Sequence, residues 1–155
     1  MHMTESSWTP PKWIYRGKRP PDDDAYFENM ARVIFLAGLN WKMINKKWPG
    51  FKKAFKGFSV EAVARFSDRD IQRLISDENI VRNRAKIVAT IKNARQFLNL
   101  KKKHGSFQRY LDSLDRSENY ANVIKELRNE FSRMGPSSAR IFLYSVGEEV
   151  KQPIE

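Results

Sequence analysis

The sequence predicts an all-α protein, a compact multi-helix domain preceded by an extended N-terminal arm. From residue 22 onward, apolar residues recur at intervals of about three to four, the spacing of one buried helical face. Ser, Asp and Gly residues lie where such segments begin or end, and the alternating pattern of strands is weak. A length of 155 residues fits a single domain. We divide the chain into an arm (1–21), a helical domain (22–147) and a C-terminal tail (148–155).

The arm contains two proline pairs, Pro10-Pro11 and Pro20-Pro21, which disfavour a helix. We expect its aromatic residues to hold it against the domain as a strap; these are Trp8, Trp13 and Tyr15. The run Asp22 to Asp24 then supplies an N-cap and favourable charge for a helix that ends at Leu36. Ala37-Gly38 ends it.

Cap and turn residues divide the rest of the chain into further helices. Their expected ranges are 41–47, 51–55, 59–66, 67–75, 81–103, 106–114, a segment carrying Ile124, Leu127 and Phe131, and 137–146. Trp48-Pro49-Gly50 is expected to stop the helix that begins at Trp41. Ser67 and Asp70 have the spacing of a capping box. The helix over 81–103 is defined by one apolar face: Ile87, Ile91, Ala94 and Leu98.

The chain is strongly basic, with a formal net charge of +11. Two long runs contain no acidic residue, 38–60 and 79–110. Their basic residues are Lys42, Lys46, Lys47, Lys52, Lys53 and Lys56 in the first, and Arg82, Arg84, Lys86, Lys92, Arg95, Lys101, Lys102, Lys103 and Arg109 in the second. A polyanion gains binding free energy from counterion release at such a surface, so nucleic acid is the expected partner. An anionic membrane surface is the competing partner, and solvated helix faces are the simplest alternative.

The composition excludes several classes of site. There is no cysteine, and His2 and His104 are the only histidines, so neither disulfides nor a zinc site is expected, and no cofactor is implied. No apolar run reaches the roughly 20 residues of a membrane-spanning helix, and the N-terminus lacks a signal-peptide pattern. We therefore expect an intracellular protein of the cytoplasm or nucleoid, with no membrane partner. No feature indicates an obligate protein partner.

A short turn from Arg133 to Ala139 joins the last two expected helices. Gly135 allows close approach, and the N–H groups that open the second helix, around Ser137 and Ser138, can hold a phosphate with the help of the helix dipole. An ordinary helical corner with Gly and Pro as punctuation is the alternative interpretation.

Five blocks of the sequence together resemble the 3-methyladenine DNA glycosylase I family of the helix-hairpin-helix superfamily. The blocks are Phe27-Glu28, Ala37-Gly38-Leu39-Asn40-Trp41, 51–55, 80–87 and Asn93-Ala94-Arg95, in the order and at the spacings of that family. The similarity runs from about Asp22 to Leu98 and resumes weakly from Met134 to Gly147. The resemblance implies a helix-hairpin-helix glycosylase fold whose hairpin anchors the phosphate backbone. It also implies a protein that rotates a damaged base of duplex DNA into an aromatic pocket.

The resemblance also assigns roles to single residues. Gly38 and Leu39 would form the wedge that fills the gap left by the base, and Trp41 would be the pocket tryptophan. The alternatives are a core leucine that caps the helix and a buried core tryptophan. Trp13 and Tyr15 are the candidates for further pocket aromatics. Three basic residues are expected at DNA phosphates: Arg82, Arg84 and Lys86.

Several positions depart from the family. Its pocket glutamate aligns with Val33, its Cys and His zinc ligands are missing, and Tyr15-Arg16-Gly17 replaces its aromatic motif. Glu28 is the candidate for a substitute catalytic carboxylate, with a cap or solvated charge as its alternative role.

We expect a monofunctional glycosylase of base excision repair that hydrolyses an alkylated purine such as 3-methyladenine from duplex DNA. Aromatic faces would attract a cationic base that is already a good leaving group. The alternative is a non-catalytic module that recognises damaged or distorted DNA, and Val33 favours it. A third possibility, an RNA-binding or membrane-surface protein, uses the charge alone.

Overall fold

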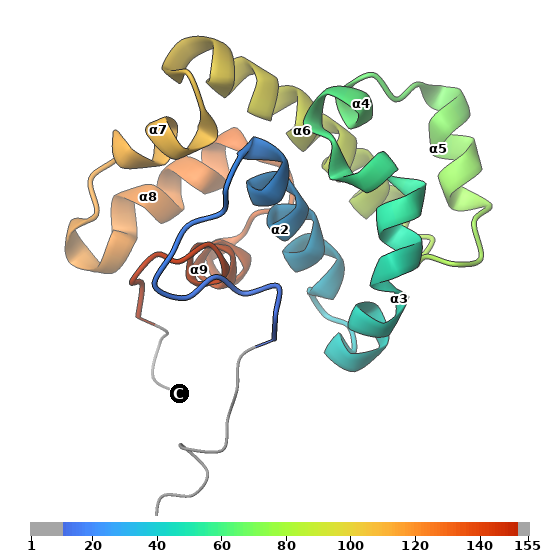
Figure 1. The fold of residues 1–155 in the computed structure, drawn as a ribbon, viewed down its shortest axis with the longest axis horizontal. Helices are drawn as coiled ribbons and strands as arrows, with labels where there is room; N and C mark the ends of the chain where they lie inside the picture. Colours follow the sequence, from blue (N-terminus) through green and yellow to red (C-terminus); the bar gives the residue numbers. More distant parts are fainter. Residues whose placement is uncertain (1–10, 152–155) are drawn as a thin grey trace, which may run out of the picture.

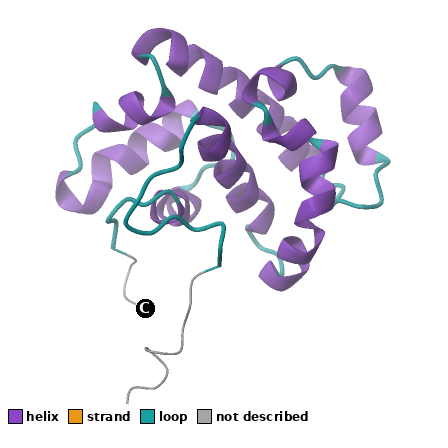
Figure 2. Ribbon diagram, in the orientation of Figure 1, coloured by secondary structure: helices purple, strands orange, loops and turns teal. Residues whose placement is uncertain are grey.

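The computed structural model describes residues 11–151, which form helices joined by short loops and contain no strand (Figures 1 and 2). The elements are α2 (Asp23–Leu36), α3 (Trp41–Ala54), the short 3₁₀ helix η1 (Lys56–Phe58), α4 (Val60–Ala64), α5 (Asp68–Ile75), α6 (Arg84–His104), α7 (Phe107–Asp112), α8 (Ser117–Glu130) and α9 (Pro136–Ser145). The predicted all-α class is confirmed. Within the described residues, no helix is both long enough and apolar enough to cross a membrane.

Helix α2 lies in the middle of the molecule, with α3 to α5 on one side and α7 to α9 on the other (Figure 1). The long helix α6 crosses behind α2 and contacts α4, α5 and α7, so it joins the two sides. Every residue of α2 from Asn29 to Leu36 is buried. Both ends of α2 therefore have fixed positions, which matters because the functional site lies along this helix.

The predicted caps are present at the starts of the helices. The Asp22 carboxylate accepts a hydrogen bond from the Ala25 N–H at 2.9 Å, and the Ser67–Asp70 capping box is formed. The long helix begins at Arg84, three residues later than predicted from Val81, because the Asn83 side chain caps it by accepting from the Lys86 N–H at 3.1 Å.

The predicted stop at Trp48-Pro49-Gly50 is wrong, since α3 continues through Pro49 to Ala54. A proline inside a helix costs about 3 kcal/mol. Trp48 stacks on Phe51 at 4.9 Å and on Phe58 at 5.1 Å between ring centroids. Burying each such aromatic side chain stabilises by about 1.5 to 3 kcal/mol, so aromatic packing on both sides of the proline outweighs the lost hydrogen bond.

The described part of the arm, residues 11–21, is non-helical and packed on the domain, as predicted. The Tyr15 N–H donates to the Ser145 carbonyl at 2.9 Å, and the Asn29 side chain donates to the Trp13 and Ser145 carbonyls, each at 3.1 Å. Gly147 is needed here because a Cβ at this position would lie 2.1 Å from the Lys18 carbonyl oxygen. Trp8 lies outside the described residues.

Residues 148–151 also pack on the domain. Glu148 and Val150 are buried, and the Asn119 side chain pairs with the backbone of Lys151. The Glu148 carboxylate accepts from Arg116 and from the Tyr120 hydroxyl. The boundary drawn at residue 147 remains a prediction.

Candidate nucleic-acid interface and base pocket

The turn between α2 and α3 exposes three large apolar side chains. Leu39 is 36% exposed, Trp41 42% and Met43 37%. Gly38 makes the turn possible because its φ of 75° lies in the left-handed region that favours glycine. No other large hydrophobic residue of the described chain is exposed to this degree. An apolar projection of this kind is suited to insertion between stacked bases.

Lys86, predicted at a DNA phosphate, is buried with 4% of its surface exposed, so its predicted surface position is wrong. Its Nζ donates to the Ala37 carbonyl at 2.7 Å and to the Phe35 carbonyl at 3.3 Å. Burial lowers the pKa of this ammonium, and the nearby charge of Arg133 lowers it further. The side chain therefore caps the C-terminal end of α2 and supports the turn that carries Leu39.

The turn between α8 and α9 is held by a buried amide. Asn93 of α6 donates to the Ser132 carbonyl at 3.1 Å and accepts from the Ser132 N–H at 2.8 Å. Gly135 precedes α9, and a Cβ built on it would meet nothing within 4 Å. Within residues 11–151, no hydrogen bond reaches the N–H of Ser137 or Ser138. These N–H groups are thus free to donate hydrogen bonds to an anion at the start of a ten-residue helix.

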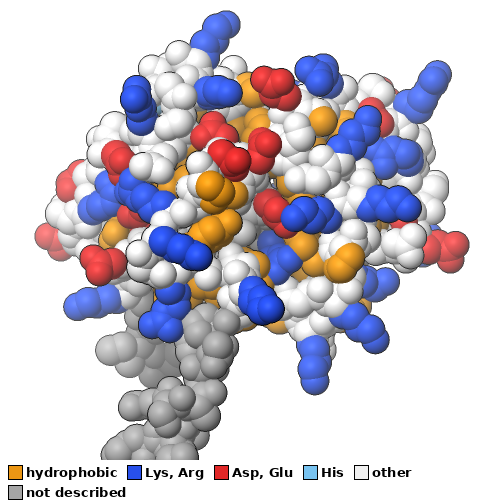
Figure 3. Space-filling view, viewed as in Figure 1, with side chains coloured by type: hydrophobic (Ala, Val, Ile, Leu, Met, Phe, Trp, Pro, Cys, Tyr) orange, Lys and Arg blue, Asp and Glu red, His pale blue; other side chains and the backbone are white. Residues whose placement is uncertain are grey.

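Arg82 and Arg84 are both exposed beside the start of α6, as a phosphate-binding role requires. Figure 3 shows basic side chains spread over the whole of the face drawn, including the right-hand side where α3 and α5 lie, with acidic side chains among them. Apolar side chains are visible between them. Arg95, in contrast, donates to the carbonyls of Ala64 and Phe66, each at 2.9 Å, and so caps α4.

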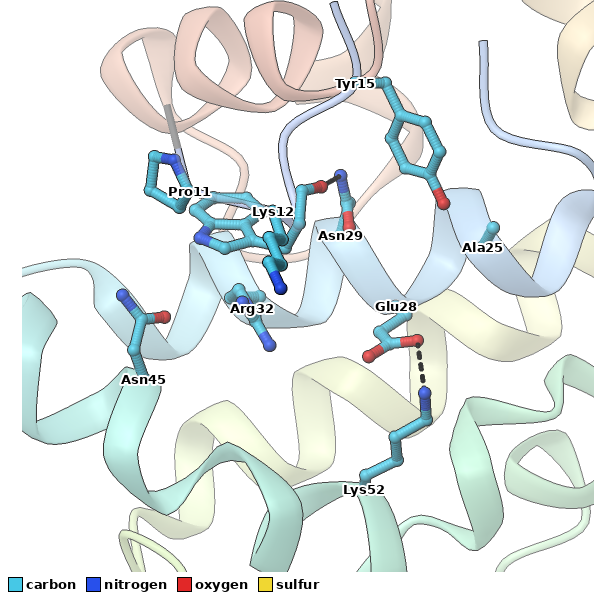
Figure 4. Close-up of a pocket in the computed structure, with 10 residues that line it drawn as sticks. Pro11, Lys12, Tyr15, Ala25, Glu28, Asn29, Arg32, Asn45 and Lys52 are labelled. Carbon is cyan, nitrogen blue, oxygen red and sulfur yellow. Dashed lines mark hydrogen bonds and ion pairs between the residues drawn. The ribbon is translucent and has the colours of Figure 1, made fainter. Parts of the chain in front are cut away.

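A cavity of about 470 Å³ lies between the arm, α2 and α3 (Figure 4). Three of the predicted site residues line it: Trp13, Tyr15 and Glu28. Trp41 does not line it, but its ring centroid lies 6.5 Å from that of Trp13. The cavity is therefore next to the exposed turn.

Val33, predicted in the pocket, is 2% exposed and does not line this cavity, so that prediction is wrong. The lining positions of α2 follow one helical face and include Glu28, Asn29 and Arg32. Val33 is rotated about 100° around the helix from Arg32 and therefore faces the core.

Both carboxylate oxygens of Glu28 have partners. Oε2 accepts from the Trp48 indole N–H at 2.9 Å, and Oε1 lies 3.6 Å from the Lys52 ammonium. Figure 4 shows Lys52 reaching Glu28 from α3. This carboxylate is fixed in position and faces the cavity, as a residue that positions or deprotonates water would.

Arg32 is the prominent residue of the cavity, and the sequence reasoning missed it. The residue is 9% exposed, and its guanidinium carbon lies 4.9 Å from the ring centre of Trp13 and 4.5 Å from that of Trp48. Burial lowers its pKa to about 10, so it remains a cation at neutral pH. The sequence does contain a signal for it. Arg32 is a charged residue inside the apolar run Met30 to Leu36, and it lies four residues after Glu28, on the same face of a helix.

Three buried polar atoms around this cavity have no hydrogen-bond partner within the described chain. They are the indole Nε1 of Trp13, Nε of Arg32 and Oδ1 of Asn45. All three residues line the cavity, and no ion pair of Arg32 is found among residues 11–151. Buried polar atoms are almost always paired, so two unpaired donors and one unpaired acceptor around one cavity indicate a binding site.

The residues present do not fit the zinc site that the resemblance implies. The chain has no cysteine, and residues 11–151 contain no group of three or more His, Asp or Glu side chains that could hold a metal ion.

A model of the methyladenine glycosylase family matches residues 12–142. The DNA-3-methyladenine glycosylase of Haemophilus influenzae is 28% identical over 113 residues, which cover 73% of this chain and 61% of that protein. DNA-3-methyladenine glycosylase 1 of Escherichia coli K12 is 37% identical over 79 residues, 51% of this chain and 42% of that protein. The aligned regions thus span between 42% and 61% of these relatives.

Solved structures of the same kind are similar over most of their length. A variant of 3-methyladenine DNA glycosylase I from Staphylococcus aureus has a TM-score of 0.75 at 28% identity, covering 86% of this chain and 81% of that one. A second structure from S. aureus, which concerns 3-methyladenine recognition, has a TM-score of 0.75 at 27% identity and covers 90% and 87%.

Proposed function

The chain belongs to the methyladenine glycosylase family, and from this premise we propose that it is a DNA glycosylase of base excision repair. It binds duplex DNA, rotates an alkylated or otherwise damaged purine nucleotide into the cavity beside Trp13, and hydrolyses the N-glycosidic bond. Its place of action is inside the cell, on damaged DNA.

The observation that carries this proposal is the position of the cavity. It opens between the arm, α2 and α3, next to the turn that exposes Leu39 and Trp41. A side chain that replaces an extruded base must lie close to the pocket that receives the base. The free N–H groups of Ser137 and Ser138 and the exposed Arg82 and Arg84 would hold the phosphates on either side.

In the reaction that we propose, water attacks C1′ of the extruded nucleotide. The water oxygen bonds to C1′, and the electron pair of the C1′–N9 bond leaves with the base. Glu28 accepts the proton that water loses. This proton passes to the base when the base was uncharged in the DNA and leaves as an anion, and to solvent when the base was a cation and leaves neutral. Trp48 and Lys52 hold the Glu28 carboxylate on the cavity wall.

The test is release of an abasic site from a lesion-containing duplex, detected by strand cleavage in hot alkali. We expect the wild-type protein to cleave duplexes that carry a damaged purine, tested with 3-methyladenine and with hypoxanthine, and Glu28→Gln to be slower by roughly 10² to 10⁴-fold. Gln keeps an oxygen that can accept from Trp48. Glu78→Gln, an exposed carboxylate in the loop before α6, is the matched control. Equal rates for wild type and Glu28→Gln would exclude Glu28 as the base.

A second candidate function is recognition of damaged DNA without chemistry. The observation that favours it is Val33, which is buried at the position where the resemblance implies the pocket glutamate. Such a protein would bind a duplex that contains an abasic-site analogue tightly. It would release no base at any protein concentration.

A further inference from the structure

Arg32 is a buried cation that the fold does not neutralise. Its side chain lies between the indole rings of Trp13 and Trp48, and the described residues give it no hydrogen bond and no ion pair. Glu28 is its acidic neighbour on the same face of α2, yet the Glu28 oxygens are directed to Trp48 and Lys52. Burial of an unpaired charge is costly, so the fold alone does not explain this residue.

The guanidinium also occupies the place that a cationic base would take. A planar cation gains most from the faces of tryptophan rings, and the Arg32 guanidinium already lies over the rings of both Trp13 and Trp48. Lys12 and Lys52 line the same cavity. A purine methylated at N3 or N7 carries a positive charge in DNA and would meet these two ammonium groups and Arg32, with Glu28 as the acidic group of the cavity wall. Among residues 11–151, Lys52 is the one of these three cations that has an ion-pair partner, and that partner is Glu28.

We propose that Arg32 sets the substrate class, so that the cavity accepts an uncharged purine with acceptor atoms on its edge, of the 6-oxopurine kind, in preference to a cationic purine. Arginine donates two parallel hydrogen bonds to O6 and N7 of such a base. The unpaired indole N–H of Trp13 supplies a further donor, and Oδ1 of Asn45 accepts from a ring N–H. This inference rests on the proposed glycosylase function.

Arg32 also suits the chemistry of an uncharged leaving group. A cationic base leaves as a neutral molecule, whereas an uncharged purine leaves with the electron pair of the C1′–N9 bond and develops negative charge over N7 and O6. A fixed guanidinium at that edge stabilises the developing charge, without itself giving up a proton. The same residue would oppose binding of a cationic base, because the guanidinium would repel it.

The experiment compares three duplexes that differ at one position, which holds hypoxanthine, 7-methylguanine or an abasic-site analogue. We expect wild-type protein to bind the hypoxanthine duplex about tenfold more tightly than the 7-methylguanine duplex, and Arg32→Gln to bring this ratio near one. Arg32→Lys keeps the charge without the planar pair of donors. It should therefore still bind 7-methylguanine weakly and lose affinity for hypoxanthine.

Tighter binding of the 7-methylguanine duplex by the wild-type protein, or a ratio unchanged in Arg32→Gln, would overturn the inference. If Arg32→Lys bound the hypoxanthine duplex as tightly as the wild type does, the proposed pair of hydrogen bonds from Arg32 to O6 and N7 would be excluded. The abasic duplex separates this failure from failure of the proposed function, since its affinity depends on the wedge and the phosphate contacts and not on the base.

A second measurement tests the cavity without DNA. Inosine and 7-methylguanosine are titrated separately into the protein, and the indole N–H resonance of Trp13 is followed by NMR, assigned with Trp13→Phe. Inosine should shift this resonance in the wild type, because an acceptor then reaches an N–H that has no partner. 7-Methylguanosine should leave it in place. A shift with 7-methylguanosine alone, or with neither nucleoside, would contradict the inference.

Discussion

The ammonium of Lys86 and the carbonyl oxygen of Ala37 lie 2.7 Å apart, so the start of α6 is tied to the turn that exposes Leu39. We predict that Lys86→Met lowers the free energy of unfolding by about 2 kcal/mol, because the carbonyls of Phe35 and Ala37 lose a charged donor. Chemical denaturation measures this. Lys92→Met, an exposed lysine on the same helix, should change stability little. If Lys92→Met lowered the free energy of unfolding by as much, the loss in Lys86→Met could not be attributed to the contacts of Lys86 with Phe35 and Ala37.

Arg84 lies exposed at the first position of α6, where it can reach a DNA phosphate. We predict that Arg84→Gln lowers the slope of log affinity against log salt by about one, uniformly across DNA sequences. Fluorescence anisotropy over a range of salt concentrations measures the slope. Arg69→Gln, an exposed arginine outside both acid-free runs, should leave it unchanged.

Leu39 is the predicted wedge and is 36% exposed. Leu39→Ala should weaken binding to a lesion-containing duplex by about tenfold, or roughly 1.4 kcal/mol, while the melting temperature stays near that of the wild type. If this variant instead unfolds easily and binds DNA normally when folded, Leu39 is a structural residue and not a wedge.

Ile91 provides the opposite case, because it is 3% exposed in the core face of α6. Ile91→Ala should lower the free energy of unfolding by about 2 to 5 kcal/mol. The folded fraction of this variant should keep its DNA affinity. A selective loss of affinity without loss of stability would place Ile91 in the interface.

Arg19 of the arm pairs with Asp112 of α7, with Nη1 to Oδ2 at 3.0 Å and Nη2 to Oδ1 at 2.5 Å. This hydrogen bonding lowers the pKa of Asp112 below its usual 3.8. As the pH falls below 3.8, Asp112 therefore takes up a proton in the unfolded chain before it does so in the folded chain. The pair with Arg19 stabilises the fold above that pH, and this stabilisation is lost as the pH falls through the lowered pKa. Asp112 is partly exposed, so we expect Asp112→Asn to lower stability by about 1 kcal/mol or less near neutral pH. This difference should vanish near about pH 2 in denaturation curves; a difference that persists there would contradict the assignment.

Local chemistry was sufficient to predict most of the helices. The Ser67–Asp70 capping box and the apolar face through Ile87 and Ile91 depend on residues within one or two turns of each other, and both are present. The continuation of α3 through Pro49 depends instead on Trp48 meeting Phe58 after the chain has folded. A rule based on proline alone cannot include that contact.

The site was less predictable because it is assembled from distant segments. Trp13 belongs to the arm, Arg32 to α2, and Asn45 and Trp48 to α3. The sequence predicts Lys86 at a DNA phosphate because it belongs to a basic run without acidic residues. Only the fold shows the carbonyls of Phe35 and Ala37 that accept from its ammonium. Val33 was placed in the pocket by alignment, although the neighbouring residue Arg32 is the one that faces the cavity.

The proposed function requires that the cavity beside Trp13 receives a base and that the protein then detaches it. The most direct measurement is a single-turnover reaction with excess protein on a lesion-containing duplex, in which free base and abasic strand are both quantified by chromatography and mass spectrometry. We expect the two products in equal amounts, formed at a rate that falls in Glu28→Gln. A duplex that is bound tightly by the wild-type protein and recovered with every base attached would contradict it.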